Sequence, residues 1–115
     1  KLPCILKKRR SNAVLLRDQL RDFGPIGADY AIAVRVPDGR RDKVRHRMAN
    51  AGIETAVYYA RSVPDMPWYR QKYGEQAFPV ARDICANYIT LSVGPHLTHE
   101  HMRLQAREFR KAVAS

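Results

Sequence analysis

The segment YITLSVGPHLT, residues 88–98, decides the fold of this chain. Its first part, residues 88–93, places isoleucine, leucine and valine at alternate positions, which is typical of a strand with one buried face. A glycine-proline pair at 94–95 breaks the strand, and Thr98 is a suitable N-cap for a following helix. We therefore expect a strand over 88–93 and a helix over 99–113. The residues of this helix that should point inward are Met102, Phe109 and Val113.

Two further segments with strand periodicity lie upstream. Residues 29–36, DYAIAVRV, alternate bulky apolar side chains with smaller or polar ones, and residues 54–59, ETAVYY, do the same more weakly. Between them, residues 40–51 predict a short helix, and Gly52 is suited to the left-handed residue of a Schellman cap just past its end. The bulky face of the first strand comprises Tyr30, Ile32, Val34 and Val36.

The N-terminal residues 2–23 predict a long amphipathic helix. Apolar side chains recur at intervals of three and four along one seam, and the other positions are mostly charged or polar. The seam consists of Leu2, Leu6, Ala13, Leu16, Leu20 and Phe23. Because this helix begins at residue 1 without a capping residue, we expect it to be a linker whose start is truncated.

A proline- and aromatic-rich segment, residues 60–78, separates the second and third strands. Its composition predicts a long aromatic loop with at most one helical turn near residues 67–72, and loops of this kind often close over a site. Pro79 suits the first turn of a helix that should extend to about Asn87. The whole order predicts an α+β fold, in which helices cover one face of a three-stranded, largely antiparallel sheet, with a split βαβ as the preferred topology.

The charge balance is unusual, with 21 lysines and arginines against 11 acidic residues and a net charge of +10. Residues 1–47 hold 13 of the basic and five of the acidic side chains. This excess is compatible with a phosphate-binding face, a solvated helix surface, or a face that meets an acidic surface of a larger protein. The pattern does not favour a nucleic-acid partner, since no recognised module or stacking platform accompanies the charge.

Several other classes of protein find no support in the sequence. No apolar run approaches the roughly 20 residues that cross a bilayer, and no charged-then-apolar leader is present, so we expect no membrane association and a cytoplasmic location. Cys4 and Cys85 lack companion ligands and a CxxC pair, which argues against a disulfide scaffold or a zinc module and predicts two buried cysteines. The histidines at 96, 99 and 101 lie close together in the sequence, but His99 and His101 should point to different faces of a helix, and no carboxylate or thiol completes a metal site. No nucleophile or phosphate-loop motif occurs, so self-contained catalysis is not expected.

One group of residues does suggest binding. Phenol hydroxyls and guanidinium forks gather at the end of the second strand and in the loop that follows, where they could stack on and hydrogen-bond to a sugar or a phosphate. An equally simple interpretation is that the aromatic rings close the bottom of the core. The candidate substrate-binding residues are Tyr58, Tyr59, Arg61, Trp68, Tyr69 and Arg70.

The succession of motifs in the chain resembles a known family. In chain order the motifs are Arg9-Arg10 with Leu20, GIETAVYY (52–59), a loop ending in Tyr73-Gly74, FPVA (78–81) and LSVGPHLT (91–98). This series is similar to the small domain of DegT-type aminotransferases, where a run like GI-x-T-x-x-HYP-x-P-x-H precedes F-P-x-A-E and SLP-x-x-P-x-LT. The chain departs from that pattern at Tyr58 and Pro64, where the family has histidine, at Ala60, where it has proline, and at Arg82, where it has glutamate.

The resemblance implies a homodimeric, fold-type I enzyme that uses pyridoxal phosphate to move an amino group from glutamate or glutamine to a keto-sugar, often nucleotide-linked. In such enzymes the lysine that binds the cofactor belongs to a large domain upstream. The resemblance therefore implies that residues 1–23 are the linker helix, that residues 24–115 are the C-terminal small domain, and that the large domain is a missing partner. We expect this chain alone to contain no catalytic residue, to bind no cofactor and to be inactive. Residues 58–70 would form part of the wall of the cleft.

Two alternatives remain open at this point. The chain could be a stand-alone basic module that associates with RNA or DNA, or an inactive domain kept for dimerisation or scaffolding. Which sugar, nucleotide or amino donor would be used does not follow from the sequence.

Overall fold

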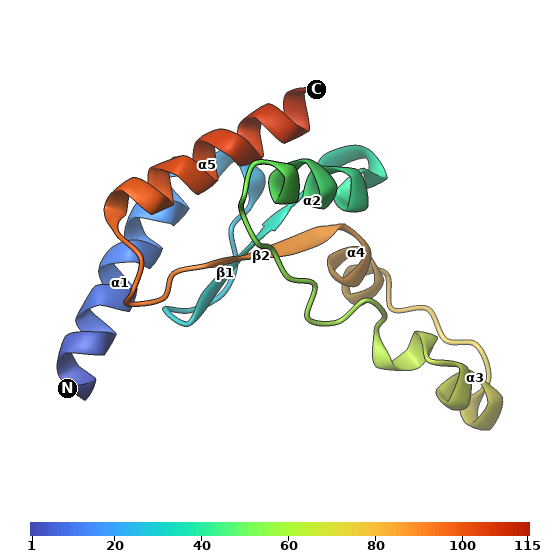
Figure 1. Cartoon of the computed structure of the whole chain (residues 1–115). Helices are drawn as coiled ribbons and strands as arrows, with labels where there is room; N and C mark the ends of the chain where they lie inside the picture. Colours follow the sequence, from blue (N-terminus) through green and yellow to red (C-terminus); the bar gives the residue numbers. More distant parts are fainter.

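The computed structural model describes all 115 residues as an α+β fold. Strands β1 (Ala31–Arg35) and β2 (Tyr88–Ser92) pair antiparallel, with Ile32 opposite Leu91. Helices α1 (Leu2–Gln19), α2 (Arg41–Asn50) and α5 (His99–Ala114) lie on one side of this sheet, whereas α3 (Pro67–Tyr73) and α4 (Pro79–Asn87) lie toward the end where β2 begins (Figure 1). Short 3-10 turns occur at η1 (Arg21–Phe23), η2 (Pro37–Gly39) and η3 (Val63–Asp65).

The predicted fold class is confirmed, but the predicted third strand is wrong. Residues 54–59 contribute a single bridge, in which Ala56 exchanges both backbone hydrogen bonds with Thr90 at 2.8 and 3.1 Å. Tyr58 and Tyr59, which end the predicted strand, are exposed, so longer pairing would bury little apolar surface there. β2 lies between β1 and Ala56, and it is antiparallel to both. The segment around Ala56 therefore runs parallel to β1, as in the preferred split βαβ topology, but it forms a single bridge and no strand.

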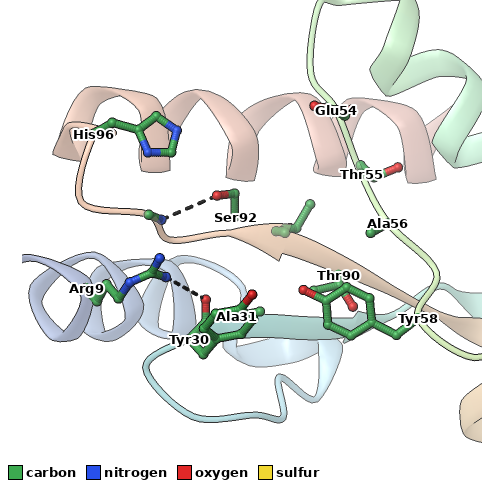
Figure 2. Close-up of a pocket in the computed structure, with 12 residues that line it drawn as sticks. Arg9, Tyr30, Ala31, Glu54, Thr55, Ala56, Tyr58, Thr90, Ser92 and His96 are labelled. Carbon is green, nitrogen blue, oxygen red and sulfur yellow. Dashed lines mark hydrogen bonds between the residues drawn. The ribbon is translucent and has the colours of Figure 1, made fainter. Parts of the chain in front are cut away.

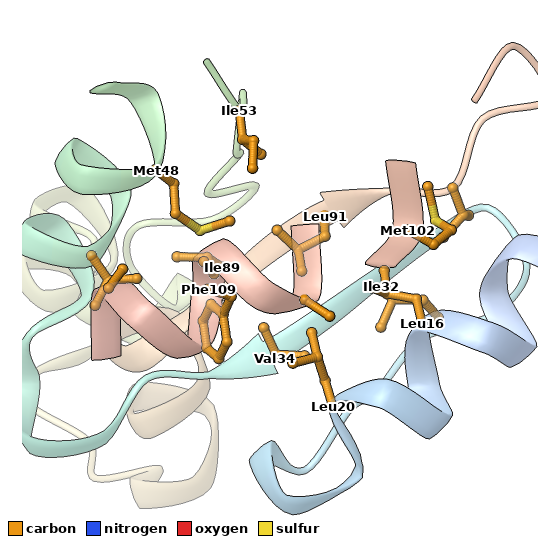
Figure 3. Close-up of a cluster of buried hydrophobic side chains, with 14 of the residues drawn as sticks. Leu16, Leu20, Ile32, Val34, Met48, Ile53, Ile89, Leu91, Met102 and Phe109 are labelled. Atoms are coloured by element: carbon orange, nitrogen blue, oxygen red, sulfur yellow. The ribbon is translucent and has the colours of Figure 1, made fainter. Parts of the chain in front are cut away.

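The core fills the space between the sheet and the three covering helices (Figure 3). Alternate residues of each strand point into it, and α1, α2 and α5 each contribute their apolar face. The ring of Phe109 is fully buried and meets the ring of Phe23 edge to face, with centroids 4.8 Å apart. The largest fully buried side chains are Phe109, Leu16, Leu20, Ile32, Met48, Ile89, Leu91 and Met102.

Some residues of the predicted apolar faces lie outside this core. Leu2 and Leu6 are exposed, because the first turns of α1 extend past the sheet and the other helices (Figure 1). Tyr30 is 70% exposed, since it precedes β1 and its ring packs under Arg9 instead. The prediction that both cysteines are buried is also wrong, because Cys4 lies on the same projecting part of α1.

The helix ends agree with the sequence prediction. Gly52 has a φ of 82°, Ile53 donates its backbone N–H to the Met48 carbonyl at 2.9 Å, and Gly52 donates to Ala49 at 3.0 Å. These are the two hydrogen bonds of a Schellman cap. At the start of α5, Thr98 Oγ1 accepts from the His101 backbone and His101 Nδ1 accepts from the Thr98 backbone, which forms a capping box.

Residues 60–78 contain more helix than the sequence predicts. Pro64 and Pro67 each stand in the first turn of a helical segment, η3 and α3 respectively, where proline has a suitable φ and its missing N–H costs nothing. Prolines that suggested a loop therefore begin helices here. α3 packs against η3 and projects away from the core, whereas α4 occupies the range predicted for it (Figure 1).

Candidate functional site

The face of the sheet that the three large helices leave uncovered carries small and polar side chains. Ala31, Ala33, Thr90 and Ser92 alternate with the buried residues of the two strands. A hollow of about 270 Å³ lies over this face (Figure 2). Its polar lining residues are Arg9, Tyr30, Glu54, Thr55, Tyr58, Thr90, Ser92 and His96. We call this hollow the sheet groove.

Helix α1 places a guanidinium at one end of the sheet groove. Arg9 lies over the Tyr30 ring, with 5.1 Å between its guanidinium carbon and the ring centroid, and donates to the Tyr30 carbonyl at 3.1 Å (Figure 2). Two other arginines of α1 hold the adjoining turn, because Arg10 and Arg17 pair with Asp29 at 3.1 and 3.8 Å. The position of Arg9 is thus fixed by several neighbouring contacts.

The turn after β2 closes the same end. The Gly94 backbone N–H donates to Ser92 Oγ at 3.4 Å (Figure 2). A Cβ at position 94 would lie 2.5 Å from the His96 ring, so a larger residue there would displace the imidazole from the groove. The groove therefore combines hydroxyl groups, a guanidinium, an imidazole and the Glu54 carboxylate. This set of donors and acceptors suits a ligand with several hydroxyl groups.

The six residues predicted to bind substrate fall into three places. Tyr58 lines the sheet groove, and it also lines a smaller apolar hollow of about 160 Å³ together with Tyr59. Arg61 and Arg70 line a separate hollow of about 360 Å³. Trp68 and Tyr69 line neither the sheet groove nor these two hollows. The structure therefore brings the six together in pairs and does not form one site from them.

Trp68 and Tyr69 belong to an aromatic cluster on α3. The Tyr73 ring lies 6.4 Å from the Trp68 ring and 4.7 Å from the Tyr69 ring, and the Lys72 ammonium lies 5.1 Å from the Trp68 centroid. Trp68 and Tyr73 remain exposed. These rings do not close the bottom of the core, because α3 lies away from it (Figure 1).

The hollow that contains Arg61 and Arg70 is organised by Asp65. Arg82 donates to both oxygens of this carboxylate, at 2.6 and 3.1 Å, and Arg70 and Ser62 donate to it at 3.1 and 2.8 Å. Hydrogen bonds from Arg82, Ser62 and Arg70 hold the pKa of the Asp65 carboxyl well below its usual range, although partial burial opposes this. The same ion pair raises the pKa of Arg82.

Sequence reasoning missed part of both sites. In the sheet groove it missed Arg9, Tyr30, Thr90, Ser92 and His96 as lining residues. The signal for Thr90 and Ser92 was their alternation with the buried residues of the strand, which places them on the open face. Arg82 was noted as a departure from a motif, but nothing in the sequence placed it beside Asp65.

The chain itself does not offer a site for an aldehyde cofactor or a metal. All six lysines are exposed. Lys111 lines a hollow between α1 and α5, where its companions include Arg103, Arg107 and Arg110 but no carboxylate. A buried amine near a paired acid is therefore absent, and the residues present do not fit pyridoxal phosphate. No three histidine, cysteine, aspartate or glutamate side chains are grouped for a metal ion. None of the helices combines the length and apolarity needed to cross a membrane.

Comparison with known proteins relates these features to one family. The model of the DegT/DnrJ/EryC1/StrS aminotransferase family matches residues 1–106. The erythromycin biosynthesis sensory transduction protein EryC1 of Saccharopolyspora erythraea is 31% identical over 61 residues, which cover 52% of this chain and 17% of that protein.

Solved structures show the same fold. DesV of S. venezuelae, in complex with a ketimine intermediate, superposes with a TM-score of 0.79 at 22% identity, covering 99% of this chain and 33% of DesV. The aminotransferase TlmJ of Streptoalloteichus hindustanus gives a TM-score of 0.81 at 20% identity, covering 98% and 33%. Helicobacter pylori PseC, an aminotransferase involved in the biosynthesis of pseudoaminic acid, gives 0.79 at 19% identity, covering 97% and 33%. The chain thus spans about a third of the length of these structures.

Proposed function

This chain belongs to the DegT/DnrJ/EryC1/StrS aminotransferase family, and we propose that it acts as the small domain of a pyridoxal-phosphate-dependent sugar aminotransferase. The proposed reaction moves an amino group from glutamate or glutamine to a keto-sugar. The observation that carries the proposal is the family match over residues 1–106. The superpositions agree with it, because they include nearly all of this chain but about a third of each similar structure.

In this proposal the cofactor is held outside this chain. Pyridoxal phosphate would supply the electron sink for amino transfer, and its lysine would belong to a large domain that precedes residue 1. Residues 1–23 would be the linker helix, and residues 24–115 the small domain. Leu2, Ile5 and Leu6 are apolar and exposed, which supports the proposal that a surface of the large domain covers the first turns of α1. The homodimer and the cytoplasmic location expected from the sequence stay predictions.

The role proposed for this chain is to form one wall of the substrate cleft. The sheet groove is open on one side, so a second surface facing it would enclose a sugar-sized ligand and exclude water. Within it, Tyr58, Thr90 and Ser92 offer hydroxyl groups that could orient the hydroxyls of a sugar, and Arg9 offers a fixed cationic donor. Residues 58–70 would extend this wall.

The experiment is a kinetic comparison in the enzyme that contains this chain. We expect Tyr58→Phe to raise the KM for the keto-sugar several-fold and to leave the KM for glutamate unchanged, because the lost hydroxyl faces the sugar alone. Tyr73→Phe is the matched control, since Tyr73 lines none of the three hollows. Equal keto-sugar kinetics for Tyr58→Phe and the unsubstituted enzyme would remove the wall assignment. Absence of amino transfer to every keto-sugar tried would remove the proposed reaction.

A further inference from the structure

The hollow formed by η3, α3 and α4 has more positive than negative side chains among its lining residues. Arg61, Arg70 and Arg82 all line it, and Asp65 is the one carboxylate among its lining residues. We infer that the three arginines form a binding site for a phosphate group, which we call the arginine site. Its assignment to the substrate of the enzyme rests on the proposed function, whereas the anion binding itself does not.

Asp65 orients two of the three guanidinium groups. Its side chain is 12% exposed, and it receives a two-point ion pair from Arg82 and a single bond from Arg70. This leaves Nη1 of Arg82 and Nε and Nη1 of Arg70 without a partner in the protein, on groups whose positions are already fixed. Pre-oriented donors lose less conformational freedom when an anion binds, so the arrangement favours binding.

Arg61 has no part in that ion-pair network. It lies two residues before η3, is exposed, and makes no side-chain hydrogen bond or ion pair, although it lines the same hollow. A purely structural role would require Arg82 and Asp65, which tie α4 to η3, but it would not require Arg61. The third guanidinium is therefore the observation that favours a ligand over a structural clamp.

The chemistry of the site fits a phosphate better than a carboxylate. Guanidinium forks match phosphate oxygens in pairs, and a phosphate can accept from several arginines at once. Three guanidinium groups and one carboxylate line the hollow, which leaves an excess of positive charge. Glu75 reduces this excess only at longer range, through its charge interaction with Arg82. Position 82 carries arginine where the motif quoted above has glutamate, so the site depends on a departure from that motif.

The test is a calorimetric titration of the 115-residue protein at physiological ionic strength with inorganic pyrophosphate, and in parallel with a nucleoside diphosphate. We expect Arg61→Ala to weaken pyrophosphate binding at least about tenfold, and Arg61→Lys, which keeps the charge but loses the fork, to give an intermediate loss. Arg107→Ala is the matched control, because Arg107 is also an exposed arginine without a hydrogen bond and lies on α5. Circular dichroism and the thermal midpoint of each variant confirm that the fold is kept.

The outcomes separate the site from the proposed function. Loss of binding in Arg61→Ala but not in Arg107→Ala supports the arginine site, even if the enzyme transfers no amino group. Equal losses in the two variants, or unchanged binding in Arg61→Ala, would overturn the site while leaving the amino-transfer proposal standing. Tighter binding of the nucleoside diphosphate than of pyrophosphate supports a nucleotide-linked substrate as the source of the phosphate, whereas equal binding supports free phosphate.

Discussion

Asn12 of α1 donates its side-chain amide to the Gly94 carbonyl at 3.1 Å, which joins the first helix to the turn that follows β2. The same nitrogen also lies 3.4 Å from the Val93 carbonyl and 3.1 Å from that of Leu97. Asn12 is 3% exposed, so these carbonyls have little access to water. The contact fixes α1, and with it Arg9, relative to the sheet groove.

We expect Asn12→Ala to lower the free energy of unfolding by about 1–3 kcal/mol, because it leaves buried carbonyl groups without a donor. Urea denaturation followed by circular dichroism measures this change. Asn50→Ala is the control, since Asn50 is exposed at the end of α2 and makes no side-chain hydrogen bond. Equal stabilities for the two variants would show that the contact does not hold α1 in place.

Phe109 is expected to be one of the most sensitive core positions. Phe109→Ala removes a fully buried ring and its edge-to-face partner contact with Phe23, and it should cost about 3–5 kcal/mol. The same truncation at Phe78, which is exposed before α4, should cost much less. The measurement is the chemical denaturation midpoint of each variant. A small effect at Phe109 would mean that α5 packs on the sheet differently.

Acid should weaken the protein partly through Asp65. Hydrogen bonds from Arg82, Ser62 and Arg70 lower the pKa of Asp65 in the folded state, so its contribution to stability is complete above its ordinary pKa of about 4 and is lost as the pH falls below that value. Asp65→Asn should reduce stability at neutral pH, and the difference from the unsubstituted protein should shrink in acid.

The experiment for Asp65 is a series of urea titrations between neutral pH and about pH 2. Asp22 and Asp83 also have a lowered pKa, held by Arg110 and Arg35 respectively, so some acid sensitivity should remain in Asp65→Asn. Asp42→Asn is the control, because the Asp42 side chain is 80% exposed and pairs with its neighbour Arg41 alone. Parallel pH curves for the Asp65→Asn variant and the unsubstituted protein would contradict the prediction.

Gly27 should tolerate substitution less well than Gly39. Both have positive φ angles, of 113° and 65°, but a Cβ at Gly27 would collide with the Ala31 carbonyl, whereas nothing lies within 4 Å of one at Gly39. We expect Gly39→Ala to cost about 1–2 kcal/mol from backbone strain alone and Gly27→Ala to cost more. Thermal unfolding of the two variants provides the comparison, and a milder effect at Gly27 would show that this turn rearranges.

The basic surface should not make the protein a specific nucleic-acid binder. We expect no measurable affinity for duplex DNA or single-stranded RNA at physiological salt and a weak affinity at low salt, because the net charge of +10 acts without a recognition module. Fluorescence anisotropy at several salt concentrations tests this. Retention of tight binding at physiological salt would favour the stand-alone binding module over the proposed enzyme domain.

Sequence reasoning succeeded where the pattern was local and periodic. The residues around Leu91 read as a buried strand, Thr98 as a cap and Gly52 as a left-handed helix end, because each depends on near neighbours in the chain. It overestimated the length of the strand at Ala56, since the length of an edge strand depends on how its side chains pack against β2 and not on strand propensity alone. It also read Pro64 as a loop residue and allowed at most one helical turn near residues 67–72, whereas Pro64 begins η3 and α3 extends from Pro67 to Tyr73.

The candidate sites were less accessible to sequence reasoning because they join distant segments. Arg9 and Thr90 are 81 positions apart and line one groove, and Arg82 meets Asp65 through the packing of α4 on η3. The hydrophobic periodicity of a single segment does not predict which distant residues it will contact. The sequence singled out the aromatic residues of α3 as candidates, but their separation from the groove depends on the direction in which η3 and α3 leave the sheet.

The position of β2 between β1 and Ala56 has a kinetic consequence. The central strand of this small sheet is the last to leave the ribosome, so the earlier segments can make no sheet hydrogen bonds with it until residues 88–92 have been synthesised. Native pairing must therefore close long loops late, which slows folding relative to a protein built from local hairpins. A nascent chain that stops before residue 88 should expose Ile32 and Val34 and be prone to aggregation.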